Sequence, residues 1–170
     1  MGVRELINRL FVGEWGVHPD NHKRPAADQP VRVMPVPARL YLPLQQHLGG
    51  PARPVVLVGQ KVLKGQLIAD AQGKISAPIH ASVSGTVLAI GEVTAPHPSG
   101  LPFKAITIES DGDNRWIDTE PLADPLSAAP EEIARRAGLA GVVGLGGATF
   151  PSARSEERRV GKECPRLCRS

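Results

Sequence analysis

The sequence predicts a mainly β domain built from short strands, followed by the start of an α/β segment. Glycine and proline are frequent, at 18 and 17 of 170 residues, and aromatic residues are scarce at 4%. The apolar stretches between Pro54 and Ile90 are short and are broken by glycines, as tight turns between strands require. A helical pattern over Ser127–Ala137 then leads into a glycine-rich stretch.

Residues 1–29 are expected to form an N-terminal arm. Leu6, Ile7 and Leu10 are spaced to share one short helical face that ends near Gly13. Val31–Leu44 follows as extended chain, because its three prolines remove backbone donors and exclude a helix interior. This segment is expected to be an edge strand or a covering arm.

The β domain is expected to cover residues 30–112. Gly59 and Gly65 divide Pro54–Ala69 into two or three short strands, since glycine permits the positive φ of tight turns. A further strand alternates between two faces, with one face formed by Val83, Gly85, Val87 and Ala89. Gly85 indicates a bend or a close backbone approach. The strand Ala105–Ser110 and a turn at Asp111–Gly112 complete the domain.

Residues 113–153 are predicted to hold a linker, a helix and a glycine loop. Pro130 suits the first helical position, and Glu131 and Glu132 complement the positive end of the helix dipole. Gly138 is predicted to end the helix. No apolar run approaches the ~20 residues of a membrane helix, and the N-terminus lacks the apolar centre of a signal peptide.

The last residues differ from the rest in charge. The chain has 20 basic and 17 acidic residues, and Arg154–Ser170 contains six and three of them. The remaining 14 of each sign balance, so no basic stripe argues for nucleic-acid binding. Arg154–Cys164 resembles the translation of a sequencing-library adapter, and residues 154–170 are therefore expected to be non-native. A natural charged, disordered C-terminus is the alternative.

Metal and disulfide chemistry finds little support. Both cysteines lie in this tail, and Cys164 and Cys168 lack the C-x-x-C spacing of redox and iron–sulfur motifs. The histidines show no metal-ligand spacing, so surface or turn positions are expected for His18, His22, His47, His80 and His97.

Two glycine motifs carry a resemblance. V-G-Q-K-V-L-K-G-Q at Val58–Gln66 and A-P-I-H-A-S-V-S-G-T-V at Ala77–Val87 resemble the lipoyl/biotinyl-like barrel-sandwich hybrid. With G-V-H-P at Gly16–Pro19 and A-P-H-P-S-G at Ala95–Gly100, the chain resembles the N-terminal part of the RnfC family. That family is a subunit of the Rnf/Rsx ion-translocating electron-transport complex.

The glycine loop G-L-G-G-A-T-F-P, Gly144–Pro151, is the most specific element of this resemblance. It is similar to a loop shared with the flavin-binding subunit of respiratory complex I, which implies FMN contacts by Gly144, Gly146, Gly147, Ala148 and Phe150. Bare backbone amides can approach a phosphate closely there. Thr149 stands where the family usually has glycine, and a β-branched residue is costly if that position needs a positive φ.

The resemblance also implies what the whole protein does. It would pass electrons between ferredoxin or NADH and the other complex subunits, through FMN and two [4Fe–4S] clusters. It would be a peripheral protein on the cytoplasmic face of the inner membrane. Trp15 replaces a family glycine, and the lysine expected after the glycine loop and the cysteine runs that hold the clusters are absent. This chain alone is therefore expected to be a truncated, inactive part of a translocase subunit, without a cofactor of its own.

Two alternatives remain open for the β domain. Lys74 follows Gly73 between the two half-motifs, near the hairpin tip where carrier domains present a lipoyl or biotinyl lysine. The flanking text Q-G-K-I lacks the residues expected around such a lysine, so a solvated turn lysine is the plainer interpretation. The domain could instead serve as a docking module for other subunits. For the glycine loop, the plainer interpretation is an ordinary turn after a helix.

Overall fold

The computed structural model describes residues 22, 24–145 and 148–154. The chain divides into two compact units, Met1–Met34 and Pro35–Ser170. In the first unit, α2 (Arg24–Ala27) is a single helical turn, and the chain from Pro30 to Met34 is extended and exposed. The N-terminal helical face expected at Leu6–Leu10 lies outside the described residues.

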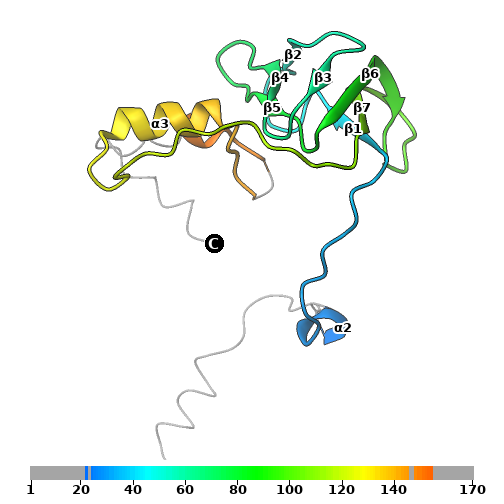
Figure 1. The fold of residues 1–170 in the computed structure, drawn as a ribbon, viewed down its shortest axis with the longest axis horizontal. Helices are drawn as coiled ribbons and strands as arrows, with labels where there is room; N and C mark the ends of the chain where they lie inside the picture. The colour runs from blue at the N-terminus through cyan, green and yellow to red at the C-terminus, as the bar shows by residue number, and fades with distance from the viewer. Residues whose placement is uncertain (1–21, 23, 146–147, 155–170) are drawn as a thin grey trace, which may run out of the picture. The chain divides into compact units, whose positions relative to one another are not determined.

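The second unit contains a curled, two-sheet β domain (Figure 1). All strand pairings within the two sheets are antiparallel. The four-stranded sheet has the order β1 (Arg39–Pro43), β7 (Pro102–Ser110), β6 (Gly85–Thr94) and β3 (Lys61–Val62). The three-stranded sheet has the order β2 (Arg53–Pro54), β4 (Leu67–Asp70) and β5 (Ile79–His80). The predicted mainly β fold is confirmed.

A single apolar cluster joins the strands of the two sheets. Its most buried members are aliphatic, which suits a thin domain whose short strands present one inward side chain in two. The cluster consists of Leu42, Leu44, Ala52, Val56, Val62, Ile68, Ala69, Ile79, Ala81, Val83, Val87, Ile106 and Ile108. The prolines before β1 leave it at the open edge of its sheet, as the sequence predicts.

Two glycine turns repeat the same hydrogen bonds six residues apart. Gly59 and Gly65 have φ of +84° and +83°, as predicted. In each turn a glutamine side chain accepts from the backbone N–H of the leucine three residues earlier, at 2.9 Å for Gln60 and 3.0 Å for Gln66. Each glycine N–H also donates to a core strand, Gly59 to Val87 at 2.8 Å and Gly65 to Ala81 at 2.7 Å. The repeated L-x-G-Q sequence therefore encodes one structural unit twice.

The strand β6 changes its register in the middle. Gly85 and Val87 face the core, and a Cβ at Gly85 would lie 1.9 Å from the carbonyl oxygen of Glu109, which confirms the predicted close approach. The predicted alternation then fails at Ala89, which is exposed, because the pairing with β7 shifts between Val87 and Ala89. Such a bulge moves the following side chains to the opposite face.

The helix α3 (Pro130–Leu139) begins at Pro130, as predicted. Gly138 does not end it, so that prediction is wrong. The stop is Gly141, at φ +68°: its N–H donates to the carbonyl of Gly138, and the N–H of Val142 donates to that of Ala137. These two bonds form a Schellman cap, which needs its left-handed residue just beyond the last helical turn.

Candidate glycine-loop site

The Schellman cap directs the chain from α3 onto the β domain. A Cβ at Gly141 would lie 2.5 Å from the carbonyl oxygen of Pro78, so only glycine allows this approach. A cleft of about 380 Å³ lies beside the contact, between β1, β5 and the segment that follows the helix. Its walls include His47, His80, Gly141 and Val143. The glycine loop thus leaves the helix against a defined surface.

The predicted loop is a narrow hairpin. Val143 and Pro151 form an antiparallel bridge, and the Gly144 N–H donates to the Phe150 carbonyl at 2.9 Å. The structure therefore brings two of the predicted site residues together at the base of the loop. Ala148 is exposed near its tip, and Gly146 and Gly147 lie outside the described residues. The short 3₁₀ helix η1 (Ser152–Arg154) follows the hairpin.

Gly144 is not required by the fold. Its φ lies outside the left-handed region, and a Cβ there would meet only the Phe150 carbonyl oxygen at an ordinary 3.8 Å. Its N–H is already used within the hairpin, so this amide is not offered to a ligand. The next side chain, Leu145, is fully exposed. Open space at this glycine fits a loop that a ligand approaches closely.

Thr149 adopts the backbone conformation that raises its cost. Its φ is +45°, a region in which an L-residue with a branched Cβ is strained by roughly 1–2 kcal/mol. Its carbonyl accepts a long hydrogen bond, 3.4 Å, from the Leu48 N–H of the β domain. Strain of this kind persists only where the surroundings over-determine the conformation, and it clusters at ligand sites.

His47 is a residue that sequence reasoning missed. A surface or turn position is expected from the sequence, but the side chain is only 6% exposed. Its Nε2 accepts from the Ala77 N–H at 3.0 Å and lies 3.0 Å from the Gly50 carbonyl oxygen and 3.1 Å from Ser76 Oγ. Of these partners only Gly50 is close in sequence, so no local pattern could have indicated the burial.

His80 connects β5 with the end of α3. Burial lowers the pKa of its imidazole, and a hydrogen bond to the Leu139 backbone opposes that shift. The side chain lines both the small cleft and a larger one of about 900 Å³. In the larger cleft the Lys64 ammonium lies 4.7 Å from the centroid of the Trp116 ring, a cation–π contact.

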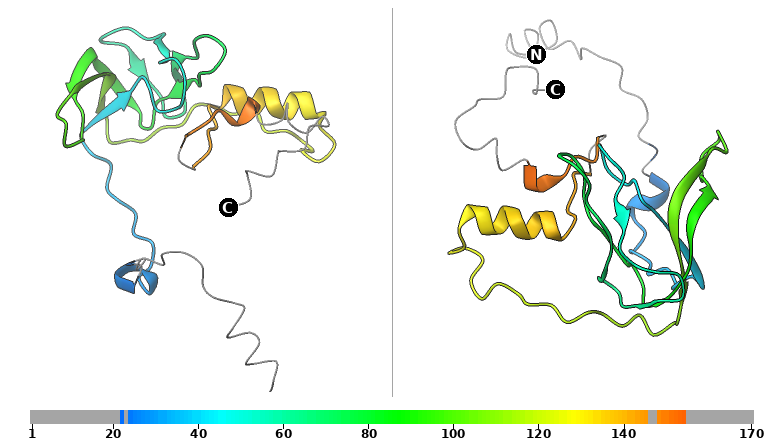
Figure 2. Two further views of the ribbon diagram at one scale, coloured as in Figure 1. Left: turned by 180° about the vertical axis from the view of Figure 1, so that it is seen from behind. Right: turned by 90° about the horizontal axis from the view of Figure 1, so that it is seen from above.

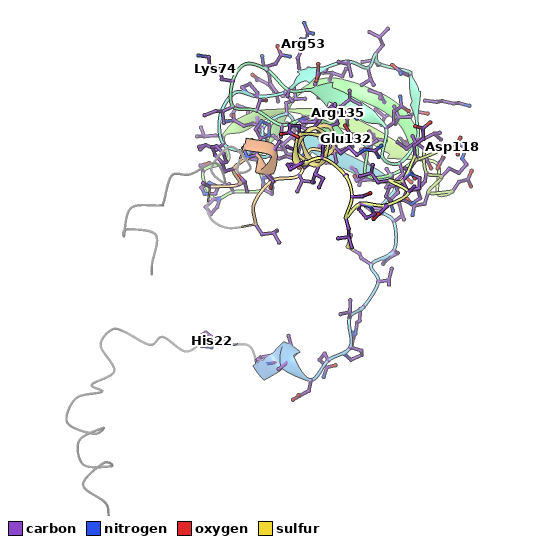
Figure 3. The ribbon with its side chains drawn as sticks, turned by 90° about the vertical axis from the view of Figure 1, so that its left-hand side faces the viewer. His22, Arg53, Lys74, Asp118, Glu132 and Arg135 are labelled. Atoms are coloured by element: carbon purple, nitrogen blue, oxygen red, sulfur yellow. The ribbon has the colours of Figure 1, made fainter. Side chains whose placement is uncertain are left out.

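The charged groups on α3 pair with one another. Glu132 accepts from Arg135 Nε at 2.7 Å and from Arg136 Nε at 2.8 Å, and Figure 3 shows Glu132 and Arg135 together on the helix. Hydrogen bonds from Arg135 and then Arg136 lower the pKa of Glu132 to about 2. A carboxylate held ionised in this way suits helix stabilisation rather than acid–base catalysis.

Lys74 lies at the outer rim of the β domain, on the connection between β4 and β5 (Figure 3). It is exposed and follows Gly73, which has φ +72°. Within residues 22, 24–145 and 148–154, no three His, Cys, Asp or Glu side chains are grouped to hold a metal ion. None of the helices in that part of the chain has the length and apolar character needed to cross a membrane.

Comparisons with known proteins address the β domain directly. The model of a family described as the RnfC barrel sandwich hybrid domain matches residues 12–113. The RnfC-type subunit of the ion-translocating oxidoreductase complex of Rhodobacter capsulatus is 53% identical over 138 residues, which cover 81% of this chain and 27% of that protein. The subunit of the same name from Pseudomonas aeruginosa is 50% identical over 135 residues, covering 79% of this chain and 17% of that protein.

A clostridial relative carries a more specific name. The corresponding subunit of the proton-translocating ferredoxin:NAD(+) oxidoreductase complex of Clostridium ljungdahlii is 42% identical over 137 residues, covering 80% of this chain and 30% of that protein. The chain thus spans less than a third of the length of these curated relatives. Since the family model extends over more than half of the chain and matches the β domain described above, the chain belongs to the RnfC family.

Proposed function

We propose that this chain forms the N-terminal part of the peripheral RnfC subunit of an Rnf/Rsx ion-translocating electron-transport complex. In that complex the subunit moves electrons between ferredoxin or NADH and the other, membrane subunits, on the cytoplasmic face of the inner membrane. The support is family membership together with the names of two kinds of relative, an ion-translocating oxidoreductase subunit and a ferredoxin:NAD(+) oxidoreductase subunit.

The glycine loop is the proposed FMN contact. One observation carries this: Gly144 is a glycine that neither its φ nor its neighbours require, in a hairpin whose tip is exposed. Gly144, Gly146, Gly147, Ala148 and Phe150 are the proposed contact residues. When bound, FMN supplies hydride and one-electron chemistry. The hairpin would hold its phosphate and exclude bulky side chains from it.

The chain alone is proposed to be inactive. The two [4Fe–4S] clusters implied for the family need runs of cysteine ligands, and the sequence contains only Cys164 and Cys168. The clusters, and most of the flavin domain, are therefore proposed to belong to parts of the subunit that correspond to the unmatched length of the relatives.

A chimera tests the proposal. Residues 1–153 would be joined to the remainder of the Rhodobacter capsulatus subunit, and bound flavin would be measured by absorbance after reconstitution. We expect about one FMN per chimera, reducible by NADH or reduced ferredoxin, and no electron transfer by the 170-residue chain. A chimera that folds but neither retains flavin nor supports electron transfer contradicts the proposal.

A docking role for the β domain is the second candidate. Val31 and Val33 lie in an extended, exposed segment, which suits a strand that adds to a partner. Capture of other complex subunits by residues 1–113 would support it. The carrier alternative at Lys74 has its own test, because a lipoyl or biotinyl group would add to the intact mass. We expect an unmodified mass, also after coexpression with the ligases.

A further inference from the structure

Three contacts hold the glycine loop and its helix against the β domain. The Leu48 N–H donates to the Thr149 carbonyl at 3.4 Å. Pro78 contacts Gly141 so closely that a side chain there is excluded. The His80 ring hydrogen-bonds to the backbone of Leu139. We call Leu48, Pro78 and His80 the loop seat, since they contact the end of α3 and both ends of the hairpin segment.

The seat residues come from two parts of the β domain that are far apart in sequence. Leu48 belongs to the turn after β1, whereas Pro78 directly precedes β5 and His80 lies in that strand. The two segments approach very closely, because a Cβ at Gly49 would lie 2.1 Å from the Ile75 carbonyl oxygen. The Gly50 N–H donates to the same carbonyl at 3.0 Å. The relative position of the seat residues therefore depends on this junction.

His47 is the side chain at the centre of the junction. The Ala77 N–H donates to Nε2 at 3.0 Å, so this nitrogen carries a lone pair and the ring proton is on Nδ1. Ser76 Oγ lies 3.1 Å from Nε2 and donates to the Gly50 carbonyl at 2.9 Å. His47 thus ties the first segment to the second, and it directly precedes Leu48 in the chain. Nδ1 is left for the cleft that His47 lines.

We propose that His47 is a positioning residue that holds the loop seat together and thereby fixes the glycine loop, including the left-handed conformation of Thr149, for its ligand. Two observations meet in this proposal, a buried imidazole with no partner beyond the junction among the described residues and a strained loop residue bonded to its sequence neighbour. The part of the proposal that concerns the ligand rests on the proposed FMN function.

Amide hydrogen exchange on the 170-residue chain tests the positioning without any cofactor. The variant His47→Leu removes the acceptor of the Ala77 N–H and keeps an apolar side chain of similar bulk. We expect exchange at Gly144 and Ser152, whose amides close the hairpin, to rise roughly tenfold, with little change at the core amide of Val87. The variant His47→Gln, which can present a carbonyl oxygen near the place of Nε2, should restore most of the protection.

Ser84→Ala is the matched control, because Ser84 is another fully buried polar side chain of the β domain. Its hydroxyl donates to Asp111 at 2.6 Å, away from the seat. We expect this variant to raise exchange at Val87 at least as much as at Gly144 and Ser152. If His47→Leu gives the same ratio as Ser84→Ala, or if Gln does not restore protection, His47 is merely structural and the proposal is overturned.

A milder variant and a flavin titration complete the design. Should His47→Leu not fold, Ser76→Ala weakens the same junction and should raise hairpin exchange about threefold; unchanged exchange overturns the proposal. In the chimera, His47→Leu should weaken FMN binding about tenfold, and His47→Gln should restore it. Unchanged affinity also overturns the proposal. An unmodified chimera without FMN contradicts the proposed function instead, and the exchange data then decide the positioning role alone.

Discussion

The glycines of the β domain and the glycine that opens the hairpin differ in what they are for. Gly59 and Gly65 are at positive φ, and Gly85 faces a backbone carbonyl that leaves no room for a side chain. Gly144 has neither constraint. The comparison teaches that glycine explained by its own fold marks architecture, whereas glycine left unexplained by it marks a place for something else.

The largest expected effect is at Gly85. A Cβ there would lie 1.9 Å from the Glu109 carbonyl oxygen, within a paired strand that cannot move aside. We expect Gly85→Ala to lower the free energy of unfolding by at least about 3 kcal/mol, measured by urea unfolding. Gly91→Ala is the control in the same strand, with nothing within 4 Å of its Cβ. Equal losses in the two variants would break the comparison.

The repeated turns allow a finer test. Gly59→Ala should cost about 1–2 kcal/mol through φ alone, since its Cβ would meet nothing within 4 Å. Gly65→Ala should cost more, because its Cβ would also lie 3.2 Å from the Trp116 ring. Urea unfolding of both variants gives the difference. If Gly59→Ala proved the more harmful, the steric account of the second turn would be wrong.

Acid unfolding separates the β domain from the helix and hairpin. Hydrogen bonds from Ser84, and then from Arg115, lower the pKa of Asp111 to about 2. Since the folded pKa lies below the unfolded value, near 3.9, this carboxylate stabilises the fold above about pH 4. The contribution is lost as the pH falls toward 2. We expect Asp111→Asn to flatten the decline of β-domain stability over this window.

The control for that experiment is Glu132, whose pKa is likewise lowered to about 2, by Arg135 and Arg136. Glu132→Gln should change the acid melting of helix signal instead of that of the β domain. Circular dichroism at helix and strand wavelengths distinguishes the two transitions. Identical effects of the two substitutions would mean that both regions unfold as one unit, and the contrast between them would be lost.

The smallest expected effect on stability is at Gly144. Gly144→Ala should change the free energy of unfolding by no more than about 0.5 kcal/mol, because its Cβ has room and its φ is ordinary. In the chimera the same substitution should weaken FMN binding roughly tenfold, by placing a methyl group where the ligand approaches. A loss of stability as large as that of Gly59→Ala, with flavin binding intact, would make Gly144 an ordinary turn residue.

Much of the fold could be predicted because its signals are local. Glycines at fixed positions, prolines before β1 and the alternation up to Val87 each constrain neighbouring residues. The bulge after Val87 could not be predicted, since it depends on the pairing with β7. The sequence favours Gly138 over Gly141 as the helix stop because both are glycines, and only the contact with Pro78 separates them.

The candidate site was predictable as a motif but not as an arrangement. The glycine loop is contiguous in sequence, and its base pairs Gly144 with Phe150. The surface that holds it is not contiguous, because His47, Ser76 and Ala77 meet only after two segments fold together. A single histidine in a polar stretch carries no signal for that burial, so its role required the structure.

The bulge in β6 has a practical consequence. Beyond it, the ribbon of β6 and β7 continues past the apolar core and ends in a turn closed by the Gly100 N–H and the His97 carbonyl (Figure 2). Side chains from His97 to Leu101 are exposed. An epitope tag or a fluorescent label inserted at this tip would leave the barrel and the loop seat untouched. The subunit could then be isolated with its assembly, or followed in cells, without altering the surfaces under test.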